Sequence, residues 1–326
     1  MANGNSAIII IVTAVFLSIA LVAVCLRCFV RLKIVHAFGR DDALIVTAMV
    51  LNIGFAACTI LGASSGMGKT KVYLAARPDE AQRGLLFWWL GQIMYILTVS
   101  VGRPAIAITL LRLTVDRIYA WVLYAVMALS TTVGIVFFSF TVSQCRPISH
   151  YWNHSPLDGH CVDMSKLLGI IYMYSGVAAA CDFTMGLLPI FLIWNLQMDR
   201  RTKVAVAGTL GMACIASTAV IVRIPFLRYA KSPDFLHATT QISVWSNVEA
   251  SLGITAGSLA TVRPIIRIFT RVASTISSHS SSCPISSKRE DETEERAGGV
   301  DDYRGSVNGD YPTPQQIPLH TIGPIP

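Results

Sequence analysis

Seven apolar stretches, each long enough to cross a lipid bilayer, fill this chain from residue 7 to residue 262. A helix of ~20 mostly apolar residues covers the ~30 Å hydrocarbon core of a bilayer, because each residue adds about 1.5 Å. The stretches span residues 7–30, 43–63, 85–111, 119–142, 167–196, 204–222 and 242–262. The sequence therefore predicts an all-α, multi-pass integral membrane protein built as a seven-transmembrane-helix bundle.

The composition supports one membrane domain followed by a tail. Only 14% of the residues are charged, whereas about 25% is usual in a soluble domain. Residues 1–272 are expected to form the transmembrane domain. Beyond them, residues 274–282 are rich in serine, residues 288–296 mix both charges, and residues 311–326 are rich in proline. Too little apolar surface is present there to offset the entropy of ordering, so residues 273–326 are predicted to be a disordered Ser/Pro-rich tail.

The basic charge indicates how the helices are oriented. Residues 273–326 hold four Lys/Arg and eight Asp/Glu, which is a net charge of −4. Because the whole chain carries +7, residues 1–272 carry +11. The loops over residues 27–40, 112–117, 200–203 and 263–271 each hold two to four Lys or Arg. Such loops usually face the cytosol, which predicts an N-terminus outside and a cytosolic tail. The loop over residues 69–83 has four more Lys/Arg on the predicted outer side and runs against this pattern.

Several ligand classes are disfavoured. No lysine lies between residues 242 and 262, and a retinal Schiff base needs a lysine amine, so no retinal is expected. The chain has no His/Cys cluster with metal-site spacing and no phosphate-binding glycine loop, so neither a metal nor another cofactor is expected. Because the basic residues lie in loops at the membrane surface, the expected partner is membrane lipid and not nucleic acid.

The loop between the fourth and fifth stretches carries two modification signals. Cys145 and Cys161 lie on the predicted oxidising side, where a disulfide persists, so we expect a bond between them. Asn153-His154-Ser155 matches the pattern of a glycosylation acceptor, which predicts a glycoprotein. Such triplets are common and Pro156 follows this one, so a plain loop is the alternative.

Three ionisable residues lie inside predicted spans: Arg103, Asp182 and Glu249. Each raises the free energy of membrane insertion by ~2.5–3.5 kcal/mol, so each is a candidate for function. Two interpretations stay open: a ligand or proton role, or a structural pair of Arg103 with Asp182 while Glu249 faces a water-filled cavity. Aromatic residues near the predicted outer helix ends form either an interfacial belt or the wall of a pocket. They are Trp88, Trp89, Tyr172, Tyr174 and Trp245.

Several short motifs follow one another along the chain between residues 31 and 267. Gly39-Arg40-Asp41-Asp42 precedes the second stretch, and Gly66-Met67-Gly68-Lys69 follows it. Further positions are Arg103, Arg112, Cys145, Trp152, Cys161, Asp182, Pro189, Trp194, Arg223, Trp245 and Glu249. Together these residues resemble the fungal rhodopsin-like integral membrane proteins, a family typified by a satratoxin-cluster membrane protein and similar to fungal receptor-like seven-helix proteins. Thr70, Ala105 and Leu110 depart from the family's histidine, serine and tyrosine.

The resemblance implies a membrane protein that is often encoded beside secondary-metabolite genes of the mycotoxin type. We expect a receptor-like or accessory protein of the plasma membrane or an endomembrane. Its expected partners are a small lipophilic ligand or metabolite and a cytosolic signalling protein. The signalling protein would meet a face formed by Asp41, Asp42, Arg112 and residues 200–203. The alternatives are a metabolite transporter or a membrane-embedded cyclase or isomerase acting on a lipophilic intermediate. In such an enzyme Asp182 or Glu249 would be the general acid; a non-enzymatic role is preferred.

Overall fold

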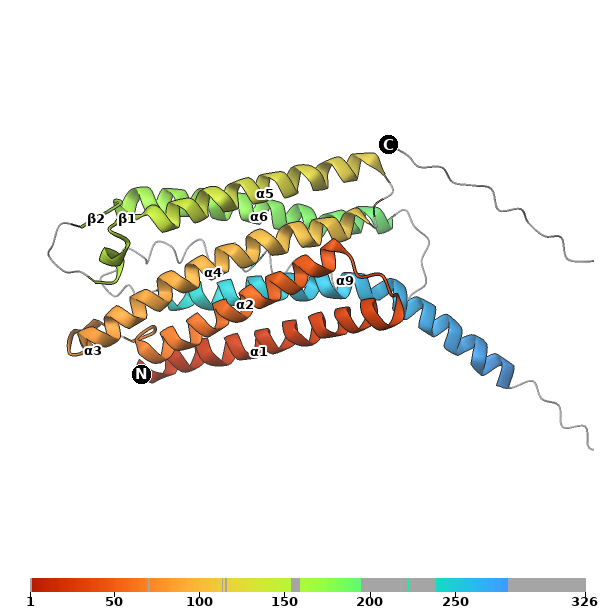
Figure 1. Cartoon of the computed structure of the whole chain (residues 1–326), viewed down its shortest axis with the longest axis horizontal. Helices are drawn as coiled ribbons and strands as arrows, with labels where there is room; N and C mark the ends of the chain where they lie inside the picture. Colours follow the sequence, from red (N-terminus) through yellow and green to blue (C-terminus); the bar gives the residue numbers. More distant parts are fainter. Residues whose placement is uncertain are drawn as a thin grey trace, which may run out of the picture. The chain divides into compact units, whose positions relative to one another are not determined.

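The computed structural model describes residues 2–69, 71–112, 114, 116–153, 159–194, 218, 222 and 239–280. The chain divides into two compact units, Met1–His279 and Ser280–Pro326. Nearly all described residues belong to the first unit, which is built from long helices (Figure 1). Most of the sixth predicted span, residues 204–222, lies outside the described residues, and so does the predicted tail from residue 281 onward.

The long helices coincide with the predicted spans. Five of the described helices are long and apolar enough to cross a membrane. They are α1 (Ala2–Phe29) with its π-helical extension η1 (Val30–Ile34), α2 (Arg40–Ser65), α4 (Pro78–Leu111), α5 (Arg117–Ser143) and α6 (Met164–Trp194). Helix α9 (Thr240–Ser280) contains the seventh predicted stretch and continues past residue 272, where the membrane domain was expected to end.

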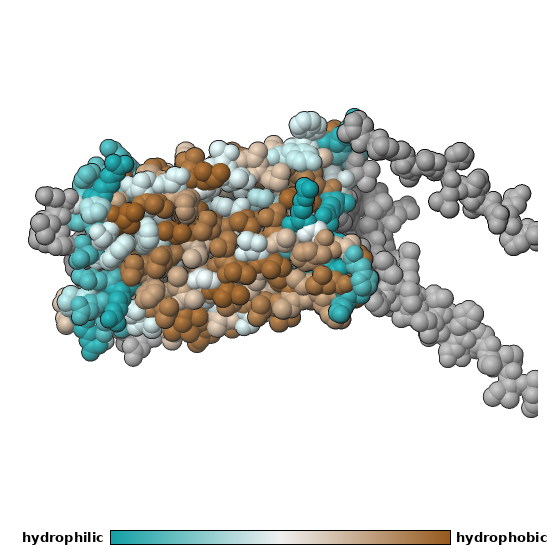
Figure 2. Space-filling model, viewed as in Figure 1, coloured by the Kyte–Doolittle hydropathy of each residue, from teal (hydrophilic) through white to brown (hydrophobic). Residues whose placement is uncertain are grey.

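The surface of the first unit is that of a protein embedded in lipid. Figure 2 shows an apolar band that covers the middle of the helices, with hydrophilic residues gathered towards their ends. Large apolar side chains on α1 and α5 point outward, and Val22, Ile118 and Trp121 are 69–77% exposed. A monomeric soluble protein rarely exposes so large a continuous apolar surface. The chain is a multi-pass integral membrane protein.

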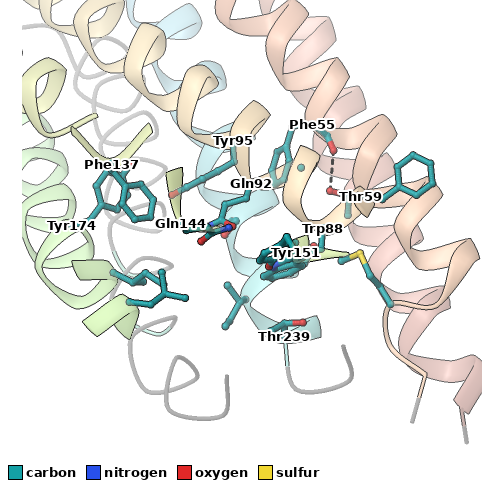
Figure 3. A pocket seen from close by; sticks show the side chains of 18 of the residues that line it. Phe55, Thr59, Trp88, Gln92, Tyr95, Phe137, Gln144, Tyr151, Tyr174 and Thr239 are labelled. Carbon is teal, nitrogen blue, oxygen red and sulfur yellow. Dashed lines mark hydrogen bonds between the residues drawn. The ribbon is translucent and has the colours of Figure 1, made fainter. Parts of the chain in front are cut away.

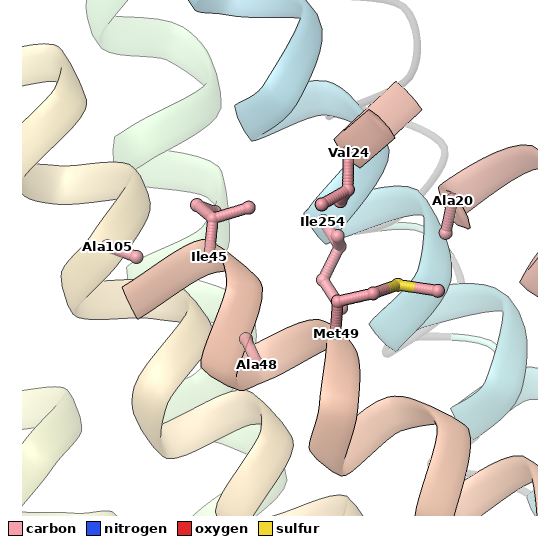
Figure 4. Packing of buried hydrophobic residues seen from close by; sticks show 7 residues of the cluster. All are labelled: Ala20, Val24, Ile45, Ala48, Met49, Ala105 and Ile254. Atoms are coloured by element: carbon pink, nitrogen blue, oxygen red, sulfur yellow. The ribbon is translucent and has the colours of Figure 1, made fainter. Parts of the chain in front are cut away.

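Small residues bring the helices of the bundle close together. Helix α2 packs between α1 and α4, while α5 contacts both α4 and α6. Between α1, α2, α4 and α9 lies a cluster of buried apolar residues (Figure 4). Three of its members are alanines, one from each of α1, α2 and α4, which let the backbones approach closely. The cluster consists of Ala20, Val24, Ile45, Ala48, Met49, Ala105 and Ile254.

Two short connections cap one end of the bundle. Helix α3 (Lys71–Ala75) follows a turn in which Gly68 adopts a φ of 86°, a left-handed conformation that favours glycine. Strands β1 (Cys145–Arg146) and β2 (His160–Cys161) pair antiparallel, and the 3-10 helix η2 (Ile148–Tyr151) lies between them. A disulfide joins Cys145 to Cys161, as predicted. Helix α6 begins three residues after this hairpin.

Candidate functional site

A network of charged side chains lies inside the bundle, between α4, α6 and α9. Arg103 Nε and Nη2 donate to the two carboxylate oxygens of Asp182 at 2.8 and 3.0 Å. The same Nη2 donates to Glu249 Oε1 at 3.1 Å. The side chains of Arg103 and Glu249 are 7% and 4% exposed. The structure thus brings together all three intramembrane ionisable residues that the sequence analysis selected.

The structure shows the pair of Arg103 with Asp182 that one of the two interpretations predicted, and it adds a contact of Arg103 with Glu249. Arg103 pairs with both carboxylates, which offsets the free energy of placing charges in a membrane interior. A central cavity with a volume of about 90 Å³ also borders Arg103, Asp182 and Glu249. The charged groups therefore hold three helices together and remain next to a space where water or a small molecule fits.

A second cavity, the hairpin-end pocket, lies where the β1–β2 hairpin meets the bundle (Figure 3). Its volume is about 110 Å³, somewhat below the ~150 Å³ of an engineered protein cavity that accommodates benzene. Seven aromatic side chains contribute to its wall: Phe55, Phe87, Trp88, Tyr95, Phe137, Tyr151 and Tyr174. Trp88 and Tyr174 thus form part of a pocket wall, one of the two predicted roles for the outer aromatic residues.

The disulfide-linked hairpin supplies polar groups to this pocket. Gln144, next to Cys145, and Tyr151, in η2, both border the cavity. The Gln144 backbone carbonyl accepts a hydrogen bond from Val162 N at 2.9 Å, which ties the end of α5 to the residue after Cys161. Desolvation raises the pKa of the Tyr151 phenol, and a hydrogen bond with Trp88 opposes that shift. The Tyr151 hydroxyl therefore keeps its proton at neutral pH and can form hydrogen bonds.

Tyr95 connects the pocket with the charged network. Its ring borders the hairpin-end pocket, and its hydroxyl donates to Glu249 Oε2 at 2.8 Å. Both side chains are buried. A molecule in the pocket would therefore contact a side chain that is bonded directly to the charged network. Sequence reasoning missed Tyr95, because a tyrosine within an apolar span does not signal a particular partner.

A second charged cluster lies where α1 ends and α2 begins. Arg27 Nε donates to Asp42 Oδ1 and Arg27 Nη2 to Asp41 Oδ2, both at 2.7 Å. Arg27 Nη1 also donates to the Gly257 carbonyl oxygen of α9 at 2.8 Å. The Arg27, Asp41 and Asp42 side chains are at most 1% exposed. This buried cluster ties α1, α2 and α9 together.

The Gly-x-Asp-Asp motif has a physical explanation in this cluster. Asp42 Oδ2 accepts from the Gly39 N–H at 2.9 Å and so caps the first turn of α2. Arg112, at the end of α4, pairs with Asp41 at 2.7 Å. A side chain on Gly39 would clash with Arg112 Nη2 and lie 2.6 Å from Asp41 Oδ1. A side chain at residue 39 would therefore force Arg112 and Asp41 to shift. The two aspartates hold three helix ends.

This burial corrects one expectation. Asp41 and Asp42 do not form an exposed face for a cytosolic protein, because Arg27 and Arg112 cover their carboxylates. Arg112, a third residue of the expected face, is exposed, with 44% of its side chain accessible. Residues 200–203 of that face lie outside the described residues. The sequence analysis counts Arg27 among the loop charges, although it lies within the first predicted span. The criterion that selected Arg103, a charge inside an apolar stretch, would also have selected Arg27.

The remaining predicted residues are distributed over the fold. Trp245 packs with Val248 and Leu252 of α9 and with Val12 and Phe16 of α1, and it borders neither cavity. Gly66 ends α2, and an added side chain there would lie 3.0 Å from the Glu80 carbonyl oxygen. Asn153 is exposed. Pro189 belongs to α6, its side chain lies outside the described residues, and so does all of Arg223.

The fold and the site define a class: a helical, multi-pass membrane protein with paired charges inside its bundle and a small aromatic pocket at one end. The sequence model of the fungal rhodopsin domain matches residues 26–268. The chain therefore belongs to the fungal rhodopsin domain family, and the resemblance noted from its motifs is confirmed. No solved structure matches the chain.

Three relatives come from fungal biosynthesis clusters. Fugralins biosynthesis cluster protein 2 of Gibberella zeae is 27% identical over 111 residues, 34% of this chain and 27% of that protein. Satratoxin biosynthesis SC1 cluster protein 4 of Stachybotrys chartarum is 24% identical over 121 residues, 37% of this chain and 42% of that protein. Polyenoic acids biosynthesis gene cluster protein Ba17b of Metarhizium anisopliae is 22% identical over 267 residues, 78% of this chain and 72% of that protein. The chain thus matches less than half the length of the first two relatives.

Proposed function

We propose that this protein is a receptor-like or accessory seven-helix membrane protein that responds to a small lipophilic ligand or metabolite. In this proposal the N-terminus and the hairpin-end pocket face outward, and the C-terminal tail lies in the cytosol. The observation that carries the proposal is the position of Tyr95, whose ring borders the pocket and whose hydroxyl bonds to Glu249. A pocket occupant and the charged network would therefore influence each other.

The proposed signal passes along α9. A ligand that moves the Tyr95 ring changes the hydrogen bond to Glu249, and Glu249 shares Arg103 with Asp182 of α6. Gly257 lies further along α9, and its carbonyl oxygen accepts from Arg27. A shift of α9 would thus reach the cluster at the end of α1 and the start of α2. A ligand shifts such an equilibrium only by its difference in affinity for the two arrangements.

The cellular setting is also proposed. The names of three relatives associate them with the biosynthesis clusters of fugralins, a satratoxin and polyenoic acids. We extend to this chain only the general association with secondary-metabolite gene clusters, in the plasma membrane or an endomembrane. A cytosolic signalling protein would be the partner on the inner side.

The test is a metabolite profile of the source organism without this gene, complemented with wild type, Tyr95→Phe or Tyr172→Phe. Tyr95→Phe keeps the ring and removes the bond to Glu249, and Tyr172→Phe makes the same chemical change outside both cavities. We expect an unchanged set of compounds, with altered onset or yield in the deletion and Tyr95→Phe strains only. An accumulating precursor without end product would indicate an enzyme, and finished product retained inside cells would indicate a transporter.

The second candidate, a membrane-embedded cyclase or isomerase, is favoured by one observation: Asp182 and Glu249 both border the central cavity. A general acid must lie within hydrogen-bond reach of a bound intermediate. Under this reading Asp182→Asn abolishes product while the protein is still present in the membrane. Met185→Leu, which changes another residue of the same cavity, should leave product formation intact.

A further inference from the structure

We propose that the hairpin-end pocket binds an uncharged, flat, ring-containing molecule whose carbonyl oxygen accepts a hydrogen bond from the Gln144 side-chain amide. This inference rests on the proposed function, because it names the chemical class of ligand for the same pocket. Three features of the pocket carry it: the charge of its wall, the arrangement of its rings, and one buried hydrogen-bond donor.

The wall of the pocket selects against charged ligands. None of the lining residues that the structure describes is Asp, Glu, Lys, Arg or His. Glu249 is not among these lining residues, and its carboxylate accepts a hydrogen bond from the hydroxyl of Tyr95, which is one of them. Burying a carboxylate or an ammonium without an opposite charge is strongly unfavourable. A neutral molecule therefore fits this wall better than an organic acid or an amine.

The rings of the wall favour a flat ligand. Phe137 of α5 and Tyr174 of α6 stack with their centroids 4.2 Å apart and 16° between their planes. Phe55 of α2 and Tyr95 of α4 form a second, tilted pair with centroids 5.6 Å apart. Figure 3 shows both pairs beside the pocket. Aromatic faces and edges bind other π-systems in stacked or edge-on geometry, and the volume of about 110 Å³ limits the ligand to a small molecule.

Gln144 indicates the polar group that the ligand carries. Its side chain borders the pocket (Figure 3), and the residue is 5% exposed. Its amide nitrogen is buried and has no hydrogen-bond partner among the residues that the structure describes. An unsatisfied buried donor is destabilising, and the amide group of glutamine offers two N–H donors. A carbonyl oxygen on the ligand would supply the acceptor that the folded chain does not.

The experiment uses the full chain in detergent and three matched probes observed by fluorine NMR line broadening. 4-Fluoroacetophenone carries the carbonyl, 4-fluoro-α-methylstyrene replaces that oxygen with a methylene group, and 4-fluorobenzoate is charged. The proteins are wild type, Gln144→Leu and Gln82→Leu; Gln82 is an exposed glutamine of α4 that does not line the pocket. Because detergent takes up each probe equally in every sample, affinities are compared between variants for one probe at a time.

We expect Gln144→Leu to lose about fivefold in affinity for the ketone, the effect of one hydrogen bond, with unchanged affinity for the hydrocarbon. Retained hydrocarbon binding shows that the variant is folded. Gln82→Leu should bind both neutral probes as wild type does, and benzoate should bind no protein measurably. Equal losses for both neutral probes in Gln144→Leu, or tight binding of benzoate, would overturn the inference. Absence of binding by every probe would also overturn it, whereas the proposed function is tested separately by the metabolite profile.

Discussion

The Tyr95 hydroxyl donates a 2.8 Å hydrogen bond to Glu249 Oε2 although the two residues are 154 positions apart in the sequence. This bond links α4 to α9 and joins the hairpin-end pocket to the charged interior. We predict that Tyr95→Phe lowers the free energy of unfolding by about 1–2 kcal/mol, the range for hydrogen bonds to charged groups and between membrane helices. Thermal unfolding in detergent measures this loss. Tyr172→Phe, the matched control, should change stability by less than about 0.5 kcal/mol.

Arg27 should be essential for stability. Arg27→Met would leave the Asp41 and Asp42 carboxylates buried without their main partner. Removal of one partner from a buried ion pair typically costs about 3–5 kcal/mol. We therefore expect little folded protein, measured as monodisperse protein on size-exclusion chromatography. Adding Asp41→Asn and Asp42→Asn should recover much of it, because no buried carboxylate is then left without a partner. The exposed Arg117 provides the control, and a normal yield of Arg27→Met would contradict this account.

Gly39→Ala should be destabilising because the added methyl group meets Arg112 and Asp41. Overpacking of this kind typically costs about 1–3 kcal/mol. Gly176→Ala in α6 is the matched control, since no atom of the described part of the chain lies within 4 Å of its added methyl group. There alanine should stabilise the helix by up to about 1 kcal/mol. Melting temperatures that move in the same direction for both variants would contradict the steric explanation.

The Cys145–Cys161 bond should be detectable by thiol counting. The chain has eight cysteines; Cys25, Cys28, Cys58 and Cys181 are free. Mass spectrometry after alkylation of the denatured chain should show two more modified thiols with reductant than without it. A Cys145→Ser/Cys161→Ser variant should lose ~3 kcal/mol, the entropy effect for a loop of about this length. Equal modification with and without reductant would exclude the bond.

Asn153 provides a test of orientation. It is exposed and lies between Cys145 and Cys161, on the side predicted to face outward. If that side is outside the cytosol and the acceptor is used, endoglycosidase treatment should increase the gel mobility of the wild type. The same treatment should leave Asn153→Gln unchanged. A shift that persists in the variant would place the glycan elsewhere.

The extent of the helices and the choice of charged residues were accessible from sequence. Apolar length alone located α1, α2, α4, α5 and α6, because the membrane imposes one length scale on every span. Arg103, Asp182 and Glu249 were selected because a charge inside such a span is rare and unfavourable. The pairing of Arg103 with both carboxylates was not accessible, since it depends on which faces of α4, α6 and α9 meet.

The sequence by itself determined that this is a helical membrane protein of the fungal rhodopsin type, because span length and ordered motifs are local properties of the chain. Tertiary structure alone decided what the motifs do. Asp41 and Asp42 bind Arg27 inside the bundle and do not form an exposed face. Tyr95 and Gln144 line a pocket. The physical reason is that hydrogen bonds and ion pairs need atoms within about 3 Å, and only helix packing brings such distant residues that close.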